Sequence, residues 1–427
     1  MSALTPLTPK NRSPKPRKAL VGLALLGTLS LLCITAPPIK NKLTPSAFAY
    51  PYDLSPSGKV SESLTAEIAA AQARIQRNPE DGLHLTELAG AYLKMARITG
   101  ADKWYTLAEE SARQSLDNLP FNNDGALLAL AKVAEANHDF AEAARLAEQA
   151  AGGEALATRV TAQLAIGQIA EANAGADELV EFSPSMASLT LRALARQAKG
   201  DRTGALKDFQ QAIAVEQPGE ARGSALARTL LGKLYADQGD HELAVSLYQE
   251  ALTIAPQYPQ ALLNLADLKV QQGRYRAAAK LYAEVDDPLA LLGLARVRAL
   301  QGKDAEARSQ WSTAETVLRE KVAANPLDHG RELAVLLLER GDEEDQAEAI
   351  ALMQAEAGNR RNAETLDTLA WALSASGRWE EAQPVIEEAI AQGIQDAEIF
   401  SRAARIETAL GNTAQAETYL SKAQTLK

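Results

Sequence analysis

The sequence offers few residues whose type and spacing would support enzymatic chemistry. His241-Glu242 lacks the second histidine, four residues on, that a zinc-protease helix needs, and the four histidines lie far apart along the chain. The single cysteine, Cys33, lies in an apolar N-terminal segment, so the rest of the chain has neither a disulfide nor a cysteine metal site. Glycine-rich phosphate loops and Gly-x-Ser-x-Gly do not occur. These observations predict a protein that is not an enzyme and that binds no metal or other cofactor.

Paired carboxylates are the remaining residues that could do chemistry. Glu343-Glu344 is one such pair, and it lies in a polar stretch where nothing would raise a carboxyl pKa by burial. A degenerate envelope hydrolase would have to use one of two irregular segments, Ile98–Tyr105 or Gly341–Gln346. We keep this as an alternative function.

The composition indicates which elements would have to carry a function. The chain has 427 residues, of which 5% are aromatic, and alanine is very frequent. Such a mixture favours closely packed helices and an all-α fold, and the length suits an elongated array better than one compact core. The net charge is −11, although seven basic and no acidic residues stand in residues 1–49. An acidic body repels phosphate backbones, so we expect no nucleic-acid partner.

Residues 1–49 have the composition of a leader. Five basic residues between Lys10 and Lys18 precede an uncharged, mostly apolar stretch at 19–36, which is the order found in a secretory signal. Ala47-Phe48-Ala49 offers a small-x-small cleavage site, but the apolar stretch is also just long enough to span a bilayer. We therefore expect an exported protein that is either periplasmic or secreted after cleavage near Ala49, or anchored by residues 19–36.

A short linker separates the leader from a long helical region. Residues 50–63 carry proline and several serines and are predicted as a non-helical linker. A helical pattern begins at Leu64 and continues to the end of the sequence, so residues 64–427 are predicted to form one array.

A repeated spacing of glycine and alanine runs through this array. Gly239 is followed five residues later by Ala244, and four residues after that by Tyr248. The same glycine-to-alanine spacing begins at six further glycines, Gly167, Gly200, Gly273, Gly302, Gly377 and Gly411. Degenerate copies fill the gaps, one of them with His138 in place of the glycine. The spacing predicts about ten helix-turn-helix repeats, because a fixed period is the mark of a repeat architecture.

The most regular copy resembles the tetratricopeptide repeat family, and Arg228 stands where the family pattern begins with tryptophan. The matching residues are Leu231, Gly232, Tyr235, Gly239, Ala244, Tyr248, Ala251 and Pro256. The resemblance implies a right-handed α-solenoid in which stacked neighbours bury a continuous core. The family's shared residues are structural, so they say little about the role of an individual member.

The resemblance also implies where a partner would bind. In this family, the first helices of successive repeats line a concave groove that takes peptides or protein segments. The residues six positions before each turn glycine, together with their neighbours in the groove, mix both charges with one tryptophan. The candidate partner-binding residues are Lys233, Asp237, Asn264, Asp267, Gln271, Arg296, Trp371 and Arg405.

The sequence thus predicts a non-enzymatic protein-protein interaction scaffold in the periplasm or cell envelope, acting in the assembly or export of an envelope system. Its partners would be proteins, and it would contact a membrane only through an uncleaved leader. A second alternative is a solenoid that binds glycan chains through its tryptophans, Trp104, Trp311, Trp371 and Trp379.

Overall fold

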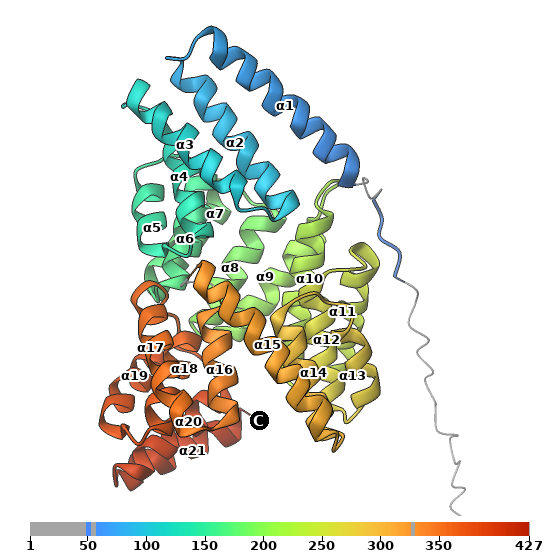
Figure 1. The fold of residues 1–427 in the computed structure, drawn as a ribbon, viewed down its shortest axis with the longest axis vertical. Coiled ribbons are helices and arrows are strands. Elements are labelled where there is room, and N and C mark those ends of the chain that lie inside the picture. The colour runs from blue at the N-terminus through green and yellow to red at the C-terminus, as the bar shows by residue number, and fades with distance from the viewer. Residues whose placement is uncertain (1–47, 53–56, 326–328, 427) are drawn as a thin grey trace, which may run out of the picture. The chain divides into compact units, whose positions relative to one another are not determined.

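A computed structural model describes residues 48–52, 57–325 and 329–426, and residues 47–427 form one compact unit. The described residues form 21 α-helices and no β-strand (Figure 1). The all-α prediction is therefore confirmed. The predicted leader, apart from Phe48 and Ala49, lies outside the described residues. Among the residues that are described, no helix is both long enough and apolar enough to cross a membrane.

After the first helix, consecutive helices of the described chain form ten pairs, which confirms a solenoid of about ten helix-turn-helix repeats. The helices of the first part are α1 (Ser57–Arg77), α2 (Gly82–Thr99), α3 (Lys103–Asn118), α4 (Asp124–Ala136), α5 (Phe140–Glu148), α6 (Gly153–Ala165), α7 (Ile169–Phe182), α8 (Met186–Ala198), α9 (Arg202–Ala214), α10 (Ala221–Asp237) and α11 (His241–Ile254). The helices of the second part are α12 (Pro259–Gln271), α13 (Tyr275–Tyr282), α14 (Pro288–Leu300), α15 (Asp304–Ala324), α16 (Gly330–Arg340), α17 (Glu343–Asn359), α18 (Ala363–Ala375), α19 (Trp379–Ala391), α20 (Ala397–Ala409) and α21 (Thr413–Thr425).

The turn inside each pair follows from its sequence. Gly239, between α10 and α11, has φ 80°, a left-handed conformation that glycine adopts at little steric cost and that ends the first helix. The side chain of Asp240 then accepts a hydrogen bond from the backbone N–H of Leu243, which caps the second helix. His138 takes the same left-handed conformation, with φ 62°, in the degenerate copy. The prediction that it replaces the turn glycine is confirmed.

The predicted alanine and large apolar positions form the core between helices. Ala244 has no exposed surface, so the two helices of its pair can approach closely, and Tyr248 is buried beside it. Gly232 permits this packing, because a Cβ atom there would lie 2.7 Å from the Tyr248 ring. Leu420 occupies the same position as Tyr248 but is 49% exposed, because no described helix packs beyond α21.

Two predicted irregularities differ from the structure. The predicted linker 50–63 is helical from Ser57 onward, because its last proline, Pro56, precedes that residue and nothing after it interrupts a helix. The predicted insertion at Ile98–Tyr105 is only a turn between α2 and α3, closed by Gly100 in the left-handed conformation.

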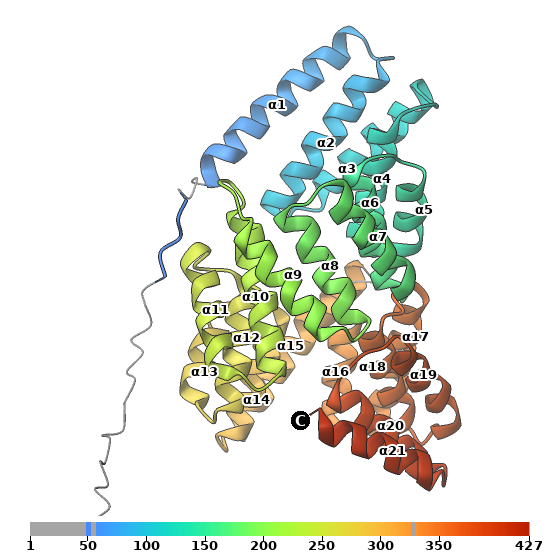
Figure 2. The ribbon, with the colours of Figure 1, turned by 180° about the vertical axis from the view of Figure 1, so that it is seen from behind.

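Repeats that are distant in sequence also meet, as Figures 1 and 2 show from opposite sides for α17 and the ends of α5 to α7. The backbone N–H of Arg361, after α17, donates a hydrogen bond of 2.9 Å to the carbonyl oxygen of Ala165, at the end of α6. The guanidinium of Arg202, on α9, donates to the carbonyl oxygen of Gln395, before α20. We call these two hydrogen bonds together the closure contact. The turn at Gly200, two residues before Arg202, belongs to it.

Glycine is required at this closure contact. Gly200 has φ 84°, and a Cβ atom there would lie 2.3 Å from the carbonyl oxygen of Gly393. Gly239 has nearly the same φ, but a Cβ atom there would meet nothing within 4 Å. Both turns need a residue in the left-handed conformation, but of the two only the turn at Gly200 also needs a residue without a side chain.

Candidate partner-binding surface

The predicted groove residues lie on the first helices of the pairs, and Lys233 is at their centre. Its ammonium Nζ lies 3.1 Å from Oδ2 of Asp237, one helical turn further along α10, and both side chains are about half exposed. Burial lowers the pKa of Lys233, but the carboxylates of Asp237, Glu364 and Asp396 outweigh it, and the pKa is raised above the ordinary lysine value. Glu364 lies on α18 and Asp396 caps α20, so acidic side chains of the later repeats contribute to the electrostatics at Lys233.

Asp267 and Arg296 continue this row on α12 and α14. The hydroxyl of Tyr282 donates a hydrogen bond to Oδ1 of Asp267. Burial raises the pKa of Asp267, although the Tyr282 hydrogen bond and the charges of Arg296 and Lys233 act in the opposite direction. The structure therefore places Asp267 within electrostatic reach of both Lys233 and Arg296, and the three residues lie on three successive first helices.

Arg296 has a partner that the sequence did not indicate. Its guanidinium donates two hydrogen bonds to the carboxylate of Glu339, of 3.0 and 2.6 Å, and so connects α14 to α16. Glu339 stands two residues before Gly341, the same position relative to the turn that Asp237 and Gln271 have. The column of residues two before the turn would have indicated Glu339 if the degenerate copy had been included.

Trp371 belongs to a second polar group, on α18 and α20. The guanidinium of Arg402 lies 4.8 Å from the centre of the Trp371 ring and donates to both carboxylate oxygens of Asp367. Asp367 is one helical turn before Trp371, and Arg402 is buried. Burial raises the pKa of Asp367 despite the opposing charge and hydrogen bonds of Arg402. Arg405, one turn after the buried arginine, is exposed.

The two predicted amides lie on α12. Asn264 is partly buried, and its Nδ2 atom has no hydrogen-bond partner in the described protein. Gln271 is exposed at the end of the helix. A buried amide donor without a partner costs free energy.

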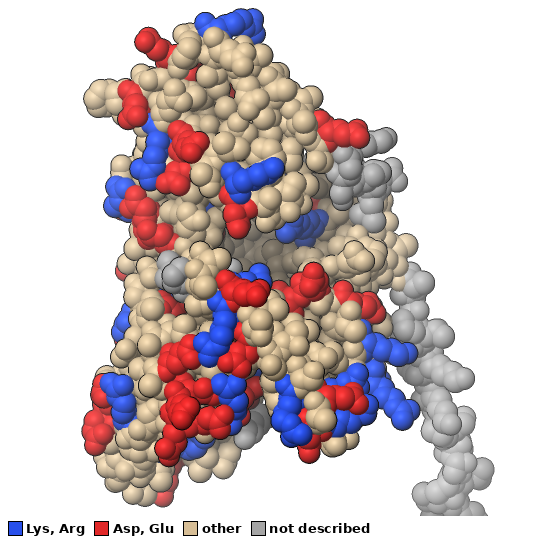
Figure 3. Space-filling view, viewed as in Figure 1, with Lys and Arg blue, Asp and Glu red and all other residues tan. Residues whose placement is uncertain are grey.

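A cavity of about 910 Å³, mostly apolar but also lined by Arg97, Glu154 and Glu220, was not predicted. Its walls come from α6, α8 and α10 and from Phe182 at the end of α7, and they include Thr161, Leu191, Leu194 and Leu226. Figure 3 shows the surface hollowed over the place that α8 takes in Figure 1, with charged side chains along its lower rim.

The sequence did contain a signal for the cavity. Thr161 and Leu194 stand six residues before Gly167 and Gly200, which is the position of Lys233 relative to Gly239. In this column the residues are small or apolar at Thr161 and Leu194, and charged at Lys132 before them and at Lys233, Asp267 and Arg296 after them. The prediction considered only the charged members of this column and the tryptophan.

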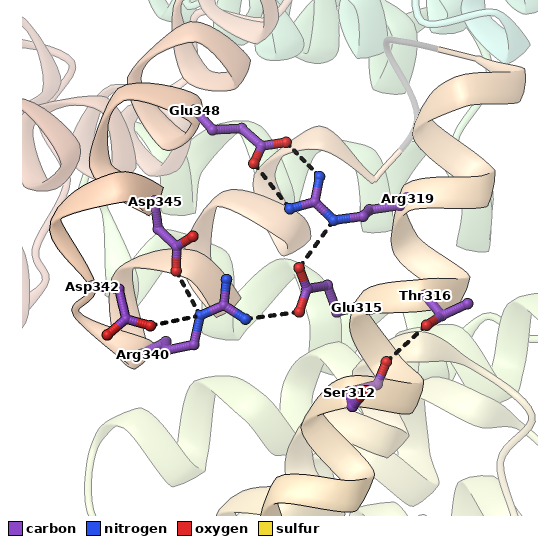
Figure 4. Close-up of polar contacts among 8 residues, drawn as sticks. All are labelled: Ser312, Glu315, Thr316, Arg319, Arg340, Asp342, Asp345 and Glu348. Carbon is purple, nitrogen blue, oxygen red and sulfur yellow. Dashed lines mark hydrogen bonds and ion pairs between the residues drawn. The ribbon is translucent and has the colours of Figure 1, made fainter.

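The acidic segment at Gly341–Gln346 does not form a catalytic carboxyl pair. The guanidinium of Arg340 binds Asp345, with 2.5 Å between the nitrogen and oxygen, and also Glu315 at 2.8 Å (Figure 4). The hydrogen bond from Arg340 lowers the pKa of Asp345, whereas a general acid would need a raised pKa. Arg319 holds Glu348 and Glu315 in the same network. These contacts join α15, α16 and α17 and serve packing.

The tryptophans of the glycan-binding alternative contribute to the core. Trp311, Trp371 and Trp379 are partly buried and pack against the cluster formed by α14 to α20, and Trp104 stacks on Tyr92 at 5.7 Å. Their faces are therefore largely used inside the protein. Among the described residues, no group of three or more His, Cys, Asp or Glu side chains is placed to hold a metal ion.

Comparisons with known proteins agree with this geometry. Three models of the tetratricopeptide repeat match residues 185–257, 235–290 and 368–427. The photosystem I assembly protein Ycf3 of Synechococcus elongatus is 34% identical over 73 residues, which are 17% of this chain and 41% of that protein. Ycf3 of Prochlorococcus marinus is 30% identical over 80 residues, 19% of this chain and 45% of the relative. The alignments thus span less than half the length of these relatives.

The repeat models match parts of the chain in which the helix pairs, the left-handed turns and the buried alanines recur together. Tetratricopeptide repeats are modules of protein-interaction scaffolds. The chain is a tetratricopeptide repeat protein.

Proposed function

We propose that this protein is a non-enzymatic scaffold of the periplasm or cell envelope, which binds a segment of a partner protein. The proposed binding surface consists of the cavity and the charged row of Lys233, Asp267 and Arg296, and we call it the inner surface. The observation that carries the proposal is the single column of residues that runs from the apolar cavity at Thr161 and Leu194 to the charged row at Lys233, Asp267 and Arg296. Such a surface suits a segment with an apolar part and a charged part. A cavity of about 910 Å³ is large enough for several apolar side chains.

The contacts of the surface support binding rather than catalysis. Two carboxyl groups of this surface with a raised pKa, Asp267 and Asp367, are held by Tyr282 and Arg402, and among the described residues neither belongs to a group of side chains that could hold a metal ion. Exposed pairs such as Lys233–Asp237 contribute little to folding and are free to exchange partners with a bound segment. The partner's chemistry is therefore complementary charge together with apolar surface.

Export is part of this proposal and is supported by the order of basic and apolar residues in residues 1–49. Sequencing the N-terminus of the protein isolated from cells tests it. A chain that begins at Tyr50 would be periplasmic or secreted, and a chain that keeps residues 19–36 would be anchored. A chain found in the cytoplasm with its leader intact would refute the proposed location.

A role in assembly or export of an envelope system is proposed from the same leader and from the assembly role in the name of the Ycf3 relatives. The experiment is capture of partners from envelope fractions by the wild-type protein and by two variants. Leu194→Glu places a charge in the cavity, and Leu243→Glu places one on an exposed leucine of α11 outside it.

The proposal expects one set of proteins to be captured by the wild type and by Leu243→Glu but to be lost with Leu194→Glu. Circular dichroism must show that both variants keep the helical content of the wild type. Equal capture by all three proteins would contradict binding on the inner surface. The addition of Arg296→Glu tests the charged part of the same surface.

A further inference from the structure

The segment Phe48–Tyr52 lies against the edge of the array where α10, α11 and α12 meet, and Figure 1 shows it in blue beside the upper ends of α10 and α11. Phe48 and Tyr50 pack against a small apolar cluster, and the hydroxyl of Tyr52 donates a hydrogen bond of 2.9 Å to the carbonyl oxygen of Glu216. The cluster consists of Ala225, Ala251, Ile254 and Ala261.

Exposure alternates along this segment. Phe48, Tyr50 and Tyr52 are partly buried, and the residues between them, Ala49 and Pro51, are exposed. The chain bends at Pro51 and Tyr52, and all three aromatic residues contact the repeats, Phe48 and Tyr50 through the apolar cluster and Tyr52 through Glu216. The rings of Tyr50 and Tyr52 also meet edge to face, 5.6 Å apart. A short peptide with aromatic side chains at alternate positions binds in this way.

The edge of α10, α11 and α12 contains the residue at which the α10–α11 repeat departs from the family pattern. Arg228 stands where the pattern has tryptophan, and its side chain is 5% exposed. It forms ion pairs with Glu216 at 2.8 Å and Glu250 at 3.1 Å, and its guanidinium lies 5.1 Å from the centre of the Phe48 ring. The aromatic surface that a tryptophan would supply comes instead from Phe48, outside the repeat.

This edge is separate from the cavity on the inner surface. Gly223 and Leu226 of α10 line the cavity, whereas Ser224 and Arg228 contribute to the edge. At about 100° per residue, these two pairs lie on opposite sides of the helix. A ligand at the edge therefore leaves the inner surface accessible.

We propose that the edge of α10, α11 and α12 is a second peptide-binding site, for a short segment with aromatic residues at alternate positions, and that Phe48–Tyr52 of this chain occupies it. Small alanines provide the surface for the rings, and the buried Arg228 provides a cation for the first ring. The proposal does not depend on the function proposed for the inner surface.

Cleavage of the leader would change the occupant. A cut after Ala49 removes Phe48 and its contact with Arg228, and leaves the two tyrosines. The site then holds its own segment more weakly. A peptide added in solution should accordingly bind better to a chain that begins at Tyr50 than to one that begins at Ala47.

The test uses the compact unit, residues 47–427, and a fluorescent peptide of residues 46–54. The tethered segment competes with the peptide at an effective concentration in the millimolar range. Fluorescence anisotropy should therefore show binding at least about tenfold tighter to the variant Phe48→Ser, Tyr50→Ser and Tyr52→Ser than to the wild type, with the chain from Tyr50 in between. A peptide with the same three residues changed to serine should not bind.

Two results would overturn the proposal. One is equal affinity, or no binding, for the wild type, the triple variant and the chain from Tyr50. The other is loss of binding when Leu194→Glu is added to the triple variant, because that would place the peptide in the cavity. If the triple variant does not fold, the chain from Tyr50 alone must still bind the peptide more tightly than the wild type.

Discussion

The backbone N–H of Arg361 donates a hydrogen bond of 2.9 Å to the carbonyl oxygen of Ala165, and so joins the loop after α17 to the end of α6. The side-chain amide of Gln392 donates to the carbonyl oxygen of Arg361 at 2.8 Å and adds the loop after α19 to the same contact. These two hydrogen bonds thereby connect the loops after α17 and α19 to the end of α6, an earlier part of the array. The carboxylates of Glu364, on α18, and of Asp396, at the start of α20, correspondingly help to raise the pKa of Lys233 on α10.

The closure contact predicts different effects of alanine at two similar glycines. Gly239→Ala should cost about 1–2 kcal/mol, because alanine resists the left-handed conformation. Gly200→Ala carries the same strain and a clash with the carbonyl oxygen of Gly393, which should add about 1–3 kcal/mol. Urea unfolding gives both costs, and hydrogen exchange should show faster exchange of the Arg361 amide in Gly200→Ala only. Equal costs and equal exchange would mean that the two parts of the array do not meet.

The Asp367–Arg402 pair should be sensitive to loss of one partner. The two side chains are only 16% and 10% exposed, so Arg402→Ala leaves a buried carboxylate without its cation and should cost about 3–5 kcal/mol. A double variant, Arg402→Met with Asp367→Leu, should be close to the wild type because neither charge remains. Urea unfolding of the three proteins checks this, and a double variant as unstable as the single one would contradict it.

The Arg296–Glu339 pair should behave in the opposite way. These side chains are 42% and 28% exposed, and water screens their charges. Replacing both by alanine should therefore change the free energy of unfolding by at most about 1 kcal/mol. The same variant should capture less partner than the wild type. Added salt should weaken capture by the wild type, so the difference between the two proteins should become smaller. A large loss of stability would show instead that the pair maintains the fold.

The raised pKa of Asp367 predicts a pH dependence with a definite sign. The folded protein keeps this carboxyl protonated at pH values where the unfolded chain has already released the proton. The free energy of unfolding should therefore fall as pH rises from the ordinary carboxyl pKa through the raised pKa. Asp367→Asn lacks this titration, so the stability of the wild type relative to the variant should decrease over the same interval. Urea midpoints between acidic and neutral pH provide the measurement, and a relative stability that rises with pH would contradict the burial of this carboxyl.

Much of the fold could be predicted because each repeat obeys local rules. Gly239, Ala244 and Tyr248 each have a reason that acts within one helix pair and its neighbour, so one spacing identifies the pairs along the chain. His138 shows that even a substituted turn keeps the same backbone conformation. The candidate residues on the first helices could be indicated for the same reason, since helical periodicity places one column on one face.

Longer-range features could not be predicted in this way. Gly200 and Gly239 have the same sequence context, but only Gly200 meets another part of the chain, which depends on the accumulated rotation of many repeats. The pairing of Arg296 with Glu339 spans a helix pair whose length departs from the regular period. The role of Arg228 depends on Phe48, which lies far from it in sequence and in the predicted leader. Whether the candidate residues bind a partner stays a prediction.

Site-specific photocrosslinking tests the central claim most directly. A photoreactive phenylalanine analogue is placed in turn at Thr161 in the cavity, at Arg405 on α20 and at Leu243 on the exposed part of α11, and the cells are irradiated before the envelope is isolated. Our account predicts that Thr161 and Arg405 crosslink to the same partner protein and that Leu243 does not. Crosslinks to that partner from Leu243 alone, or none from the two inner positions, would contradict binding on the inner surface.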